Sequence, residues 1–296
     1  MKSLRHTCTI SILVLLLIPG LSLMADASSG RVEATSRIDW SEGWFILETS
    51  YILGENSRPS PGIRQQALNA IREELPSIFI REISSLKIDS RTTVRDRIAA
   101  SPSITRLMRE QAADGETMIA RFNEDFSRFD LVFRYRLFPD IAGHFIPHIE
   151  AAHLTPELEY VPSGPYSGIV IFAEGPLPVY GTRRSSELQP ALFPKIFNAG
   201  MEMIFEERFA DPEWIRRWGP LRYFDAGEMD RVYSRVGEVP LFVHATGLFG
   251  IHSTDILVSM RSGRQLRADE HILSLLREGK IAVVYSSNSA MAADNR

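Results

Sequence analysis

Cysteine is almost missing from this sequence, in which Cys8 is the single residue of this type among 296 positions. A chain without further cysteine forms no disulfide, holds no iron–sulfur cluster and carries no thiol nucleophile. Cys8 also precedes the apolar run near the N-terminus, whereas a bacterial lipoprotein needs its cysteine just after such a run, at the cleavage point. We therefore expect a fold stabilised by ordinary hydrophobic cores, and no lipid attachment.

Long hydrophobic runs are scarce, and the one at the N-terminus has the features of an export signal. Lys2 and Arg5 precede the apolar run from Ile10 to Leu23, and the small-residue site Ala25-Asp26-Ala27 follows it. This three-part pattern is typical of a secretory signal, and the run is short for a membrane-spanning helix. We predict a signal peptide at 1–27 and a periplasmic mature chain of 296 − 27 = 269 residues, with a retained membrane anchor as the alternative.

Clusters of basic residues are missing as well. Without Lys2, Arg5 and Asp26, the 33 basic and 37 acidic residues become 31 and 36, a net charge of 31 − 36 = −5. Proteins that bind nucleic acid or anionic membranes concentrate lysine and arginine on one surface. We therefore expect no nucleic-acid partner, and no transmembrane helix after signal cleavage. The proportions of apolar and charged residues, 44% and 24%, are those of a globular protein, and the length suits two domains.

Motifs of the common enzyme classes are also missing. Ser84 and Lys87 have the SxxK spacing of serine acyl-transferases, but the SDN and KTG partner motifs do not occur. The stretch EGPLPVYG, residues 174–181, lacks the GxGxxG and GxxxxGK[ST] spacings of phosphate-binding loops. We expect no catalytic residue and no cofactor. A glycan hydrolase with paired carboxylates stays an alternative, and its candidate residues are Glu174, Glu206, Glu207 and Asp225.

The first half of the chain alternates β-rich and helical patterns. Two β-rich runs at 31–40 and 44–53 flank Ser41-Glu42-Gly43, which predicts a hairpin. A helical stripe begins at Ile63, and we expect Pro76 to kink or end that helix. Thr92, Thr93 and Val94 favour an extended segment. The last elements of this half are a helix from Ser101-Pro102 to Asp114-Gly115 and two antiparallel strands within 117–125 and 129–138.

The second half follows a polar, proline-bearing stretch at 154–168, where we place the domain boundary. The continuous apolar run GIVIFAEG, residues 168–175, predicts a strand buried on both faces. Asn198-Ala199-Gly200 predicts a hairpin turn with glycine at the position of positive φ. The C-terminal pattern predicts a β-α-β unit built from 255–260, 267–279 and 281–286.

These patterns predict an α+β protein with two small domains, each a mixed or antiparallel sheet with helices packed on it. The expected boundaries are a hairpin and linker at 28–60, a first domain at 61–150, a second domain at 163–285 and a disordered tail at 286–296.

Three of the seven histidines lie in HFIPHIEAAH, residues 144–153, and raise the question of a metal site. In a helix, His144 and His148 would lie one turn apart, as zinc sites require, with Glu150 or His153 as a third ligand. Pro147 disrupts this register. We interpret the stretch as a surface amphipathic segment without a metal, and its core-facing stripe would consist of Ile141, Phe145 and Ile149.

An aromatic cluster follows in DPEWIRRWG, residues 211–219. Asp211-Pro212 predicts a helix start, and Trp214 and Trp218 would lie one turn apart on one face. Such a stripe packs into the core or, when exposed, forms a protein interface or stacks on sugar rings. Tyr223 and Phe224 extend the cluster. As candidate interaction residues we select Trp214, Arg216, Arg217 and Trp218.

Part of the chain resembles a known family. Residues 61–140 are similar to the Lpp-twenty envelope-lipoprotein family and its flagellar relatives, on the basis of element order, the stretch DSRTTV at 89–94 and SITRLM at 103–108. From YSGIVIFAEG onward, the chain resembles the second half of uncharacterised secreted proteins that carry such a domain. Phe172 and Glu174 depart from the expected family strand, where a carboxylate and then an arginine would stand.

The resemblance implies a non-catalytic α/β module of envelope or flagellar assemblies. We therefore expect a periplasmic binding or assembly protein, with a link to the flagellar base, whose partners are envelope or flagellar proteins or further copies of the chain. A periplasmic hydrolase acting on envelope glycans and a metal-binding module are the alternatives.

Overall fold

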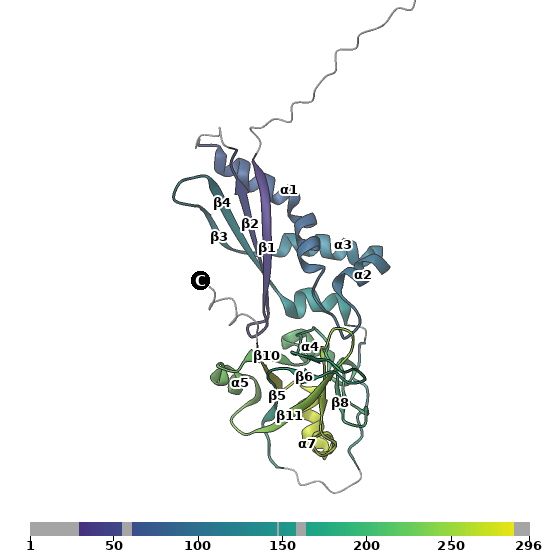
Figure 1. Ribbon diagram of the computed structural model, residues 1–296. Coiled ribbons are helices and arrows are strands. Elements are labelled where there is room, and N and C mark those ends of the chain that lie inside the picture. The colour runs from purple at the N-terminus through teal and green to yellow at the C-terminus, as the bar shows by residue number, and fades with distance from the viewer. Residues whose placement is uncertain (1–29, 55–60, 147, 158–163, 287–296) are drawn as a thin grey trace, which may run out of the picture.

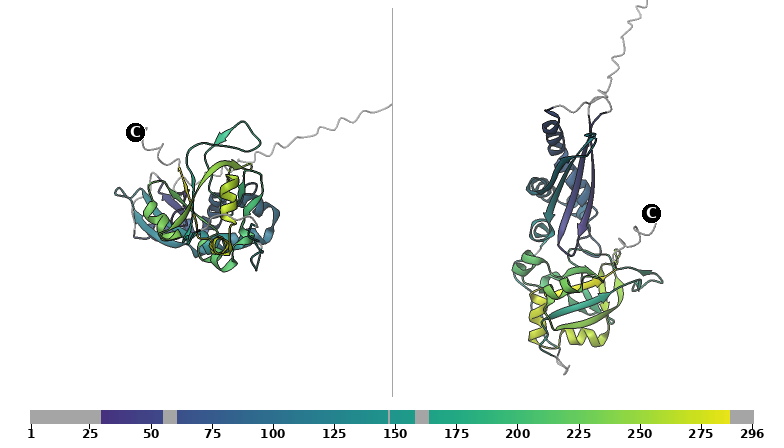
Figure 2. Two further views of the ribbon diagram at one scale, coloured as in Figure 1. Left: turned by 90° about the horizontal axis from the view of Figure 1, so that it is seen from below. Right: turned by 90° about the vertical axis from the view of Figure 1, so that its left-hand side faces the viewer.

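The computed structural model describes residues 30–54, 61–146, 148–157 and 164–286. They form two α+β domains that lie end to end (Figures 1 and 2). The expected class, two small domains with helices packed on a sheet, is confirmed. The expected export signal, most of the linker before Pro61, Pro147 and the tail after Ser286 lie outside the described residues.

The first domain is built on a four-stranded antiparallel sheet with the order β1-β2-β4-β3. We expected residues 28–60 to stand apart from the domain that follows, but β2 pairs with β4 along its whole length, with Thr49 opposite Leu131. The hairpin therefore belongs to the first domain. Local patterns do not reveal pairing between strands this far apart in sequence. The strands are β1 (Arg31–Asp39), β2 (Trp44–Ile52), β3 (Glu116–Phe122) and β4 (Arg128–Arg136).

Helix α1 (Ile63–Ile83) covers one face of this sheet. We expected Pro76 to kink or end the helix, and it does not end it, because the helix continues to Ile83. A proline inside a helix costs about 3 kcal/mol, but Ile78, Phe79 and Ile83 are buried beyond it. Each such side chain contributes roughly 1.5–3 kcal/mol on burial, so the packing of the second half outweighs the proline.

The stretch from Thr92 to Val94, which we expected to be extended, is so only in part, since Thr93 is extended and forms a β-bridge with Lys87, whereas Val94 begins helix α2 (Val94–Ala100). The Thr93 amide donates to Asp96 Oδ2 at 2.7 Å, and the Asp96 amide donates to Thr93 Oγ1 at 3.4 Å. This reciprocal pair is a capping box, in which a threonine satisfies amides that lack an intrahelical acceptor. The expected helix after Ser101 is present as α3 (Pro102–Gln111), followed by the short η1 (Ala112–Asp114).

The second domain contains a seven-stranded mixed sheet with the order β10-β13-β5-β11-β12-β8-β9. Strand β5 (Gly168–Ala173), inside the sheet, runs parallel to both of its neighbours. The other strands are β8 (Ile196–Asn198), β9 (Met203–Phe205), β10 (Arg222–Asp225), β11 (Pro240–Phe249), β12 (Asp255–Val258) and β13 (Ile281–Tyr285), and β6 (Leu177–Pro178) pairs with β7 (Ser185–Ser186) in a small ribbon.

Helices cover both faces of the second sheet. Ile169 and Ile171 of β5 point into the main core, whereas Val170 points into a smaller cluster with Val232 and Val236 of α5. The predicted burial of this strand on both faces is confirmed. The helices are η4 (Glu207–Phe209), α4 (Pro212–Trp218), α5 (Met229–Val236), α6 (Met260–Leu266) and α7 (Glu270–Arg277).

The expected β-α-β unit at the C-terminus has the right order of elements but a different topology. Strand β12 is antiparallel to β11, while β11 and β13 are each parallel to β5, so β12 and β13 run in opposite directions and are not neighbours. Two helices, α6 and α7, separate them instead of one. Periodicity identifies strands and helices but does not determine which strands pair.

The expected hairpin of β8 and β9 is present, but Met201 and not Gly200 adopts the positive φ, at 63°. The Asn198 side chain holds this turn, because its Oδ1 accepts hydrogen bonds from the amides of Gly200 (2.9 Å) and Glu202 (3.0 Å). Between the two domains the chain forms short turns, η2 (Leu137–Ile141) and η3 (Ala142–Phe145). Within the described ranges, no helix combines the length and apolar character needed to cross a membrane.

Candidate functional site at the domain junction

The tip of the β1–β2 hairpin, residues 39–43, reaches the second domain beside β10 (Figure 1). The Trp40 ring lies edge-on to the ring of Tyr223 on β10, with 5.3 Å between the ring centroids. We call these five residues the hairpin tip. Because β1 and β2 belong to the sheet of the first domain, the contacts of their tip connect the first domain to the second.

A tight set of hydrogen bonds shapes the hairpin tip. Asp39 Oδ1 accepts from Ser41 Oγ at 2.8 Å and from the Glu42 amide at 2.9 Å. An aspartate that binds amides ahead of it is a common way to stabilise a turn. Gly43 has a φ of 77°, and a Cβ there would lie 3.3 Å from a guanidinium nitrogen of Arg222. Glycine therefore satisfies both the turn and the close approach of the second domain.

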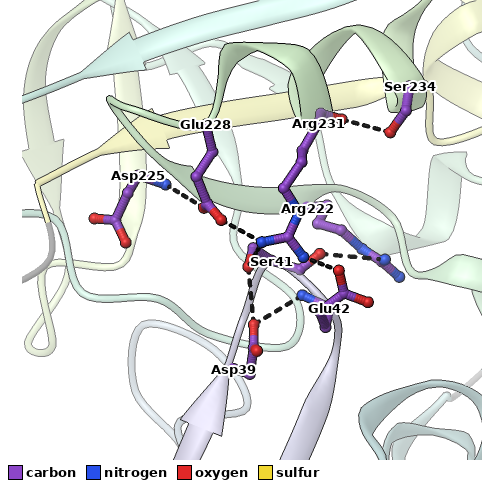
Figure 3. A network of polar contacts seen from close by, with 8 residues as sticks. All are labelled: Asp39, Ser41, Glu42, Arg222, Asp225, Glu228, Arg231 and Ser234. Atoms are coloured by element: carbon purple, nitrogen blue, oxygen red, sulfur yellow. Dashed lines mark hydrogen bonds and ion pairs between the residues drawn. The ribbon is translucent and has the colours of Figure 1, made fainter.

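A network of polar contacts joins the hairpin tip to the second domain (Figure 3). Arg231 of α5 donates to Ser41 Oγ at 2.9 Å and forms ion pairs with Glu42 and Glu228. Arg222 of β10 donates to the Ser41 carbonyl at 3.4 Å. Each partly exposed ion pair contributes up to about 1 kcal/mol. The network orients the tip more than it stabilises the fold.

Aromatic side chains form the floor of the junction. Tyr223 is buried, and its hydroxyl exchanges hydrogen bonds of 3.2 Å with the backbone of Ala191. The Tyr285 ring lies 5.8 Å from the ring of Tyr223. Burial raises the pKa of Tyr285 to about 12, and nearby carboxylates such as Asp225 add to the effect. Burial also raises the pKa of Tyr223, so both phenols are neutral at physiological pH.

Two adjoining cavities open along one side of the hairpin tip. Their volumes are about 360 and 280 Å³, and both are lined by Arg37, Ile38, Trp40 and Tyr285. We call the combined space the junction groove. Ser85, Gln189 and Ser286 are among the residues that line the larger cavity, and Asp39, Asp225, Glu228 and Arg231 line the smaller one.

The junction groove follows an edge of a sheet. Strand β1 pairs with β2 alone among the described strands. Its residues 36–38 line the larger cavity, and Asp39 lines the smaller one. An edge strand presents backbone N–H and C=O groups that another extended segment can pair with. The arrangement is suited to binding an extended chain.

The polar side chains of the groove already have structural partners. Asp39 accepts two hydrogen bonds within the hairpin tip, Glu228 accepts from the Asp225 amide at 3.0 Å, and Ser36 Oγ donates to Glu82 at 3.1 Å. A nucleophilic serine needs an adjacent base that is itself oriented by a third group. The groove residues described above include no such combination.

The predicted interaction residues lie beside this junction. Trp214 and Trp218 are half-buried on α4, and their rings stack at 5.1 Å. Arg217 is exposed and lies over both rings, at 5.2 and 5.8 Å, and Arg216 is exposed too. Trp218 Nε1 donates to the Glu278 carbonyl at 2.9 Å. The pair is thus anchored to the fold on one side and accessible on the other. Tyr223 and Phe224 are buried in β10 instead.

The histidines of 144–153 face different partners. His144 Nε2 lies 3.3 Å from Gln111 Oε1 on α3, whereas His148 Nε2 lies 3.1 Å from the Ala210 carbonyl of the second domain. His153 and Glu150 are exposed. Burial lowers the pKa of His144. In the part of the chain that the structure describes, no group of three metal-binding side chains gathers.

The two remaining motifs from the sequence, the SxxK spacing of Ser84 and Lys87 and the stretch EGPLPVYG, form no catalytic or phosphate-binding arrangement among the described residues. Ser84 ends α1 and its Oγ donates to the Ile80 carbonyl at 2.5 Å, a local contact that does not involve Lys87. Burial lowers the pKa of Lys87. The stretch EGPLPVYG contributes the short strand β6.

The four carboxylates proposed for a hydrolase do not converge. Glu206 is buried and pairs with Lys195 at 3.0 Å and with Arg208. Glu174 is exposed, and Glu207 lies next to Glu206 in η4. Asp225 is the one member of this set that lines the junction groove.

The sequence analysis missed most residues of the junction. Arg37, Trp40, Arg222 and Tyr285 belong to four separate strands or turns, so no local spacing connects them. One signal was available, since the predicted hairpin turn DWSEG carries a tryptophan at a position that would otherwise be solvent-exposed. A large aromatic residue at a hairpin tip indicates contact with another part of the protein.

Two family models match the chain, one over each domain. Residues 31–144 match the model described as Treponema pallidum Tp0624, N-terminal domain, and residues 168–287 match the model of the second domain of the same protein. No curated protein matches the chain. These matches overturn the resemblance to the Lpp-twenty family and its flagellar relatives. DSRTTV, which supported that resemblance, is a turn and helix cap that many α+β folds could contain.

Proposed function

We propose that this protein is a non-catalytic component of the cell envelope, exported to the periplasm, that binds an extended segment of a partner protein in the junction groove. The observation that carries the proposal is the position of the groove, which lies along the edge strand β1 and is lined by both domains. The flagellar association rested on the overturned resemblance and is not part of the proposal.

The mode of binding follows from the edge of the sheet. A peptide that pairs with β1 would gain backbone hydrogen bonds, while its alternate side chains would contact Trp40 and Tyr285 on the floor of the groove. Arg37 and Glu82, which also line the larger cavity, would provide charge selectivity. Strand addition of this kind needs little movement of the binding protein.

The polar contacts of the groove support binding over hydrolysis. Retaining and inverting glycosidases need two carboxyl groups that are free to act on substrate from opposite sides. Here Asp39 holds the hairpin tip and Glu228 binds Arg231 and the Asp225 amide. Export is supported by the N-terminal signal pattern.

The proposal can be tested by blocking the groove with a bulky side chain. Ser85 is exposed and lines the larger cavity, so Ser85→Trp should fill it without disturbing the core. Ser103→Trp is the matched control, because Ser103 is exposed on α3, outside the groove. Each variant would be used in cross-linking capture from the native envelope, with partners identified by mass spectrometry.

We expect one partner that is captured by the wild type and by Ser103→Trp but lost with Ser85→Trp. The same partner captured equally by both variants would contradict binding in the groove. Loss of peptidoglycan hydrolysis in a deletion strain, restored by the wild-type chain, would instead support the hydrolase alternative.

A further inference from the structure

Three arginines line a separate cavity on the other side of Arg231 from the junction groove. Figure 3 shows Arg222 and Ser234 on the side of Arg231 opposite to Asp225 and Glu228. The cavity has a volume of about 230 Å³. We call it the arginine cavity, and the polar side chains on its lining are Ser41, Glu42, Arg222, Arg231, Ser234 and Arg235.

Two of these arginines, the buried Arg235 and the half-buried Arg222, have no carboxylate as a hydrogen-bond partner. Arg235 is 7% exposed and donates to the carbonyls of Trp218 (3.1 Å), Gly219 (2.8 Å) and Gly279. Its Nε has no hydrogen-bond partner. Arg222 reaches only the carbonyls of Ser41 and Trp218, each at 3.4 Å. Neither guanidinium forms an ion pair with a described residue.

This arrangement leaves positive charge only partly compensated, because Asp39 acts on Arg222 without forming an ion pair with it. A buried charge is costly unless an opposite charge pairs with it, and two neighbouring guanidinium groups also repel each other. In line with this, burial lowers the pKa of Arg222, and burial together with the charge of Arg222 lowers the pKa of Arg235. Glu42 is the one carboxylate on the lining, and it pairs with Arg231.

We propose that the arginine cavity binds an oxyanion of the phosphate class between Arg222, Arg231 and Arg235. Guanidinium groups bind phosphate through paired, charge-assisted hydrogen bonds, so an anion here would compensate the buried charge and occupy the open donors. Glu42 presents a carboxylate to the same cavity and acts as an internal competitor. The arginine cavity shares Ser41 and Arg231 with the junction groove, but Glu42, Arg222 and Arg235 do not line the groove. Substitutions of Arg222 and Glu42 therefore test this site separately from the proposed function.

The test is calorimetric titration of the purified protein with inorganic phosphate, with sodium chloride as the ionic-strength control. Arg222→Gln removes one donor fork and should weaken binding about tenfold or more. Glu42→Gln removes the competing charge at a side chain that is 54% exposed, and should strengthen binding about threefold. Arg216→Gln is the matched control, because Arg216 is exposed on α4 and does not line the cavity.

Opposite changes for Arg222→Gln and Glu42→Gln, with Arg216→Gln unchanged, would establish the site. The Glu42 variant keeps the test decisive even if Arg222→Gln folds poorly. No phosphate binding by the wild type, or equal affinity in all variants, would overturn the proposal and leave the arginines with a structural role only.

The phosphate group could be free or part of a lipid headgroup, and a second measurement separates these sources. Sedimentation with phosphatidylglycerol vesicles would be compared with phosphatidylcholine vesicles, for the wild type and Arg222→Gln. Binding to phosphatidylglycerol that Arg222→Gln abolishes assigns a headgroup. Calorimetric binding without sedimentation assigns a soluble phosphate.

Discussion

Removing the two tryptophans of α4 one at a time should have unequal effects on stability. Trp218 donates a hydrogen bond to Glu278, stacks on Trp214 and lies 4.4 Å from the Arg235 guanidinium. These contacts contribute about 0.5–1.5, 0.5–1.5 and 1–2 kcal/mol respectively. We therefore expect Trp218→Ala to lower the free energy of unfolding by roughly 2–4 kcal/mol after partial compensation.

Trp214 has fewer partners. It shares the stack with Trp218 and an exposed contact with Arg217 at 5.2 Å, so Trp214→Ala should cost about 1–2 kcal/mol. Because the stack is lost in either variant, the double variant should cost less than the sum of the two, by about 0.5–1.5 kcal/mol.

The measurement is urea denaturation followed by far-ultraviolet circular dichroism, since the signal must not depend on the tryptophans that are removed. Trp218→Phe is a useful control, because it retains a ring for Arg235 but removes the donor to Glu278. Equal losses for the two single variants, or strict additivity in the double variant, would show that the contacts described above do not determine the role of this pair.

Three further predictions concern other parts of the chain. Gly43→Ala should lower the melting temperature, because an alanine at a φ of 77° costs about 1–2 kcal/mol. Gly62→Ala, at an exposed position, is the control, and a decrease for Gly43→Ala no larger than for this control would contradict the prediction. Burial raises the pKa of Glu206, but Lys195 and Arg208 lower it by more, so the folded pKa lies below the unfolded value of 4.5. The ion pairs of Glu206 therefore stabilise the fold above pH 4.5, and this contribution is lost as the pH falls through the folded pKa. The difference in unfolding free energy between the wild type and Glu206→Gln should narrow over the same fall in pH. N-terminal sequencing of the protein from a periplasmic fraction should begin at Ser28, and a chain that retains Met1 in the membrane pellet would refute the export signal.

Periodicity in the sequence was sufficient to identify most elements. The hairpin of β1 and β2, helix α3, strands β3 and β4 and the buried strand β5 all follow from local patterns. Predictions from local sequence patterns were wrong where contacts between residues far apart in the sequence favoured another structure. Pro76 lies inside α1 because the buried residues beyond it hold the helix against the sheet.

The junction could not be predicted in the same way. Its residues come from strands that are far apart in sequence, and their proximity depends on strand pairing that alternation alone does not specify. Trp214 and Trp218 were identified because one helical turn relates them. Arg231 and Arg235 are also one helical turn apart, on α5, but Arg222 lies on β10, so the three arginines meet only in the folded protein.

The hairpin has a mechanical consequence. Strands β1 and β2 have nine residues each and run without interruption from the domain junction to the far end of the first domain. A strand of that length spans about 30 Å, so a rotation of about 10° at the hairpin tip would move its distant end by about 5 Å. A small rearrangement of the contacts of Trp40 and Arg231 would therefore be amplified into a larger displacement at the far end of the first domain.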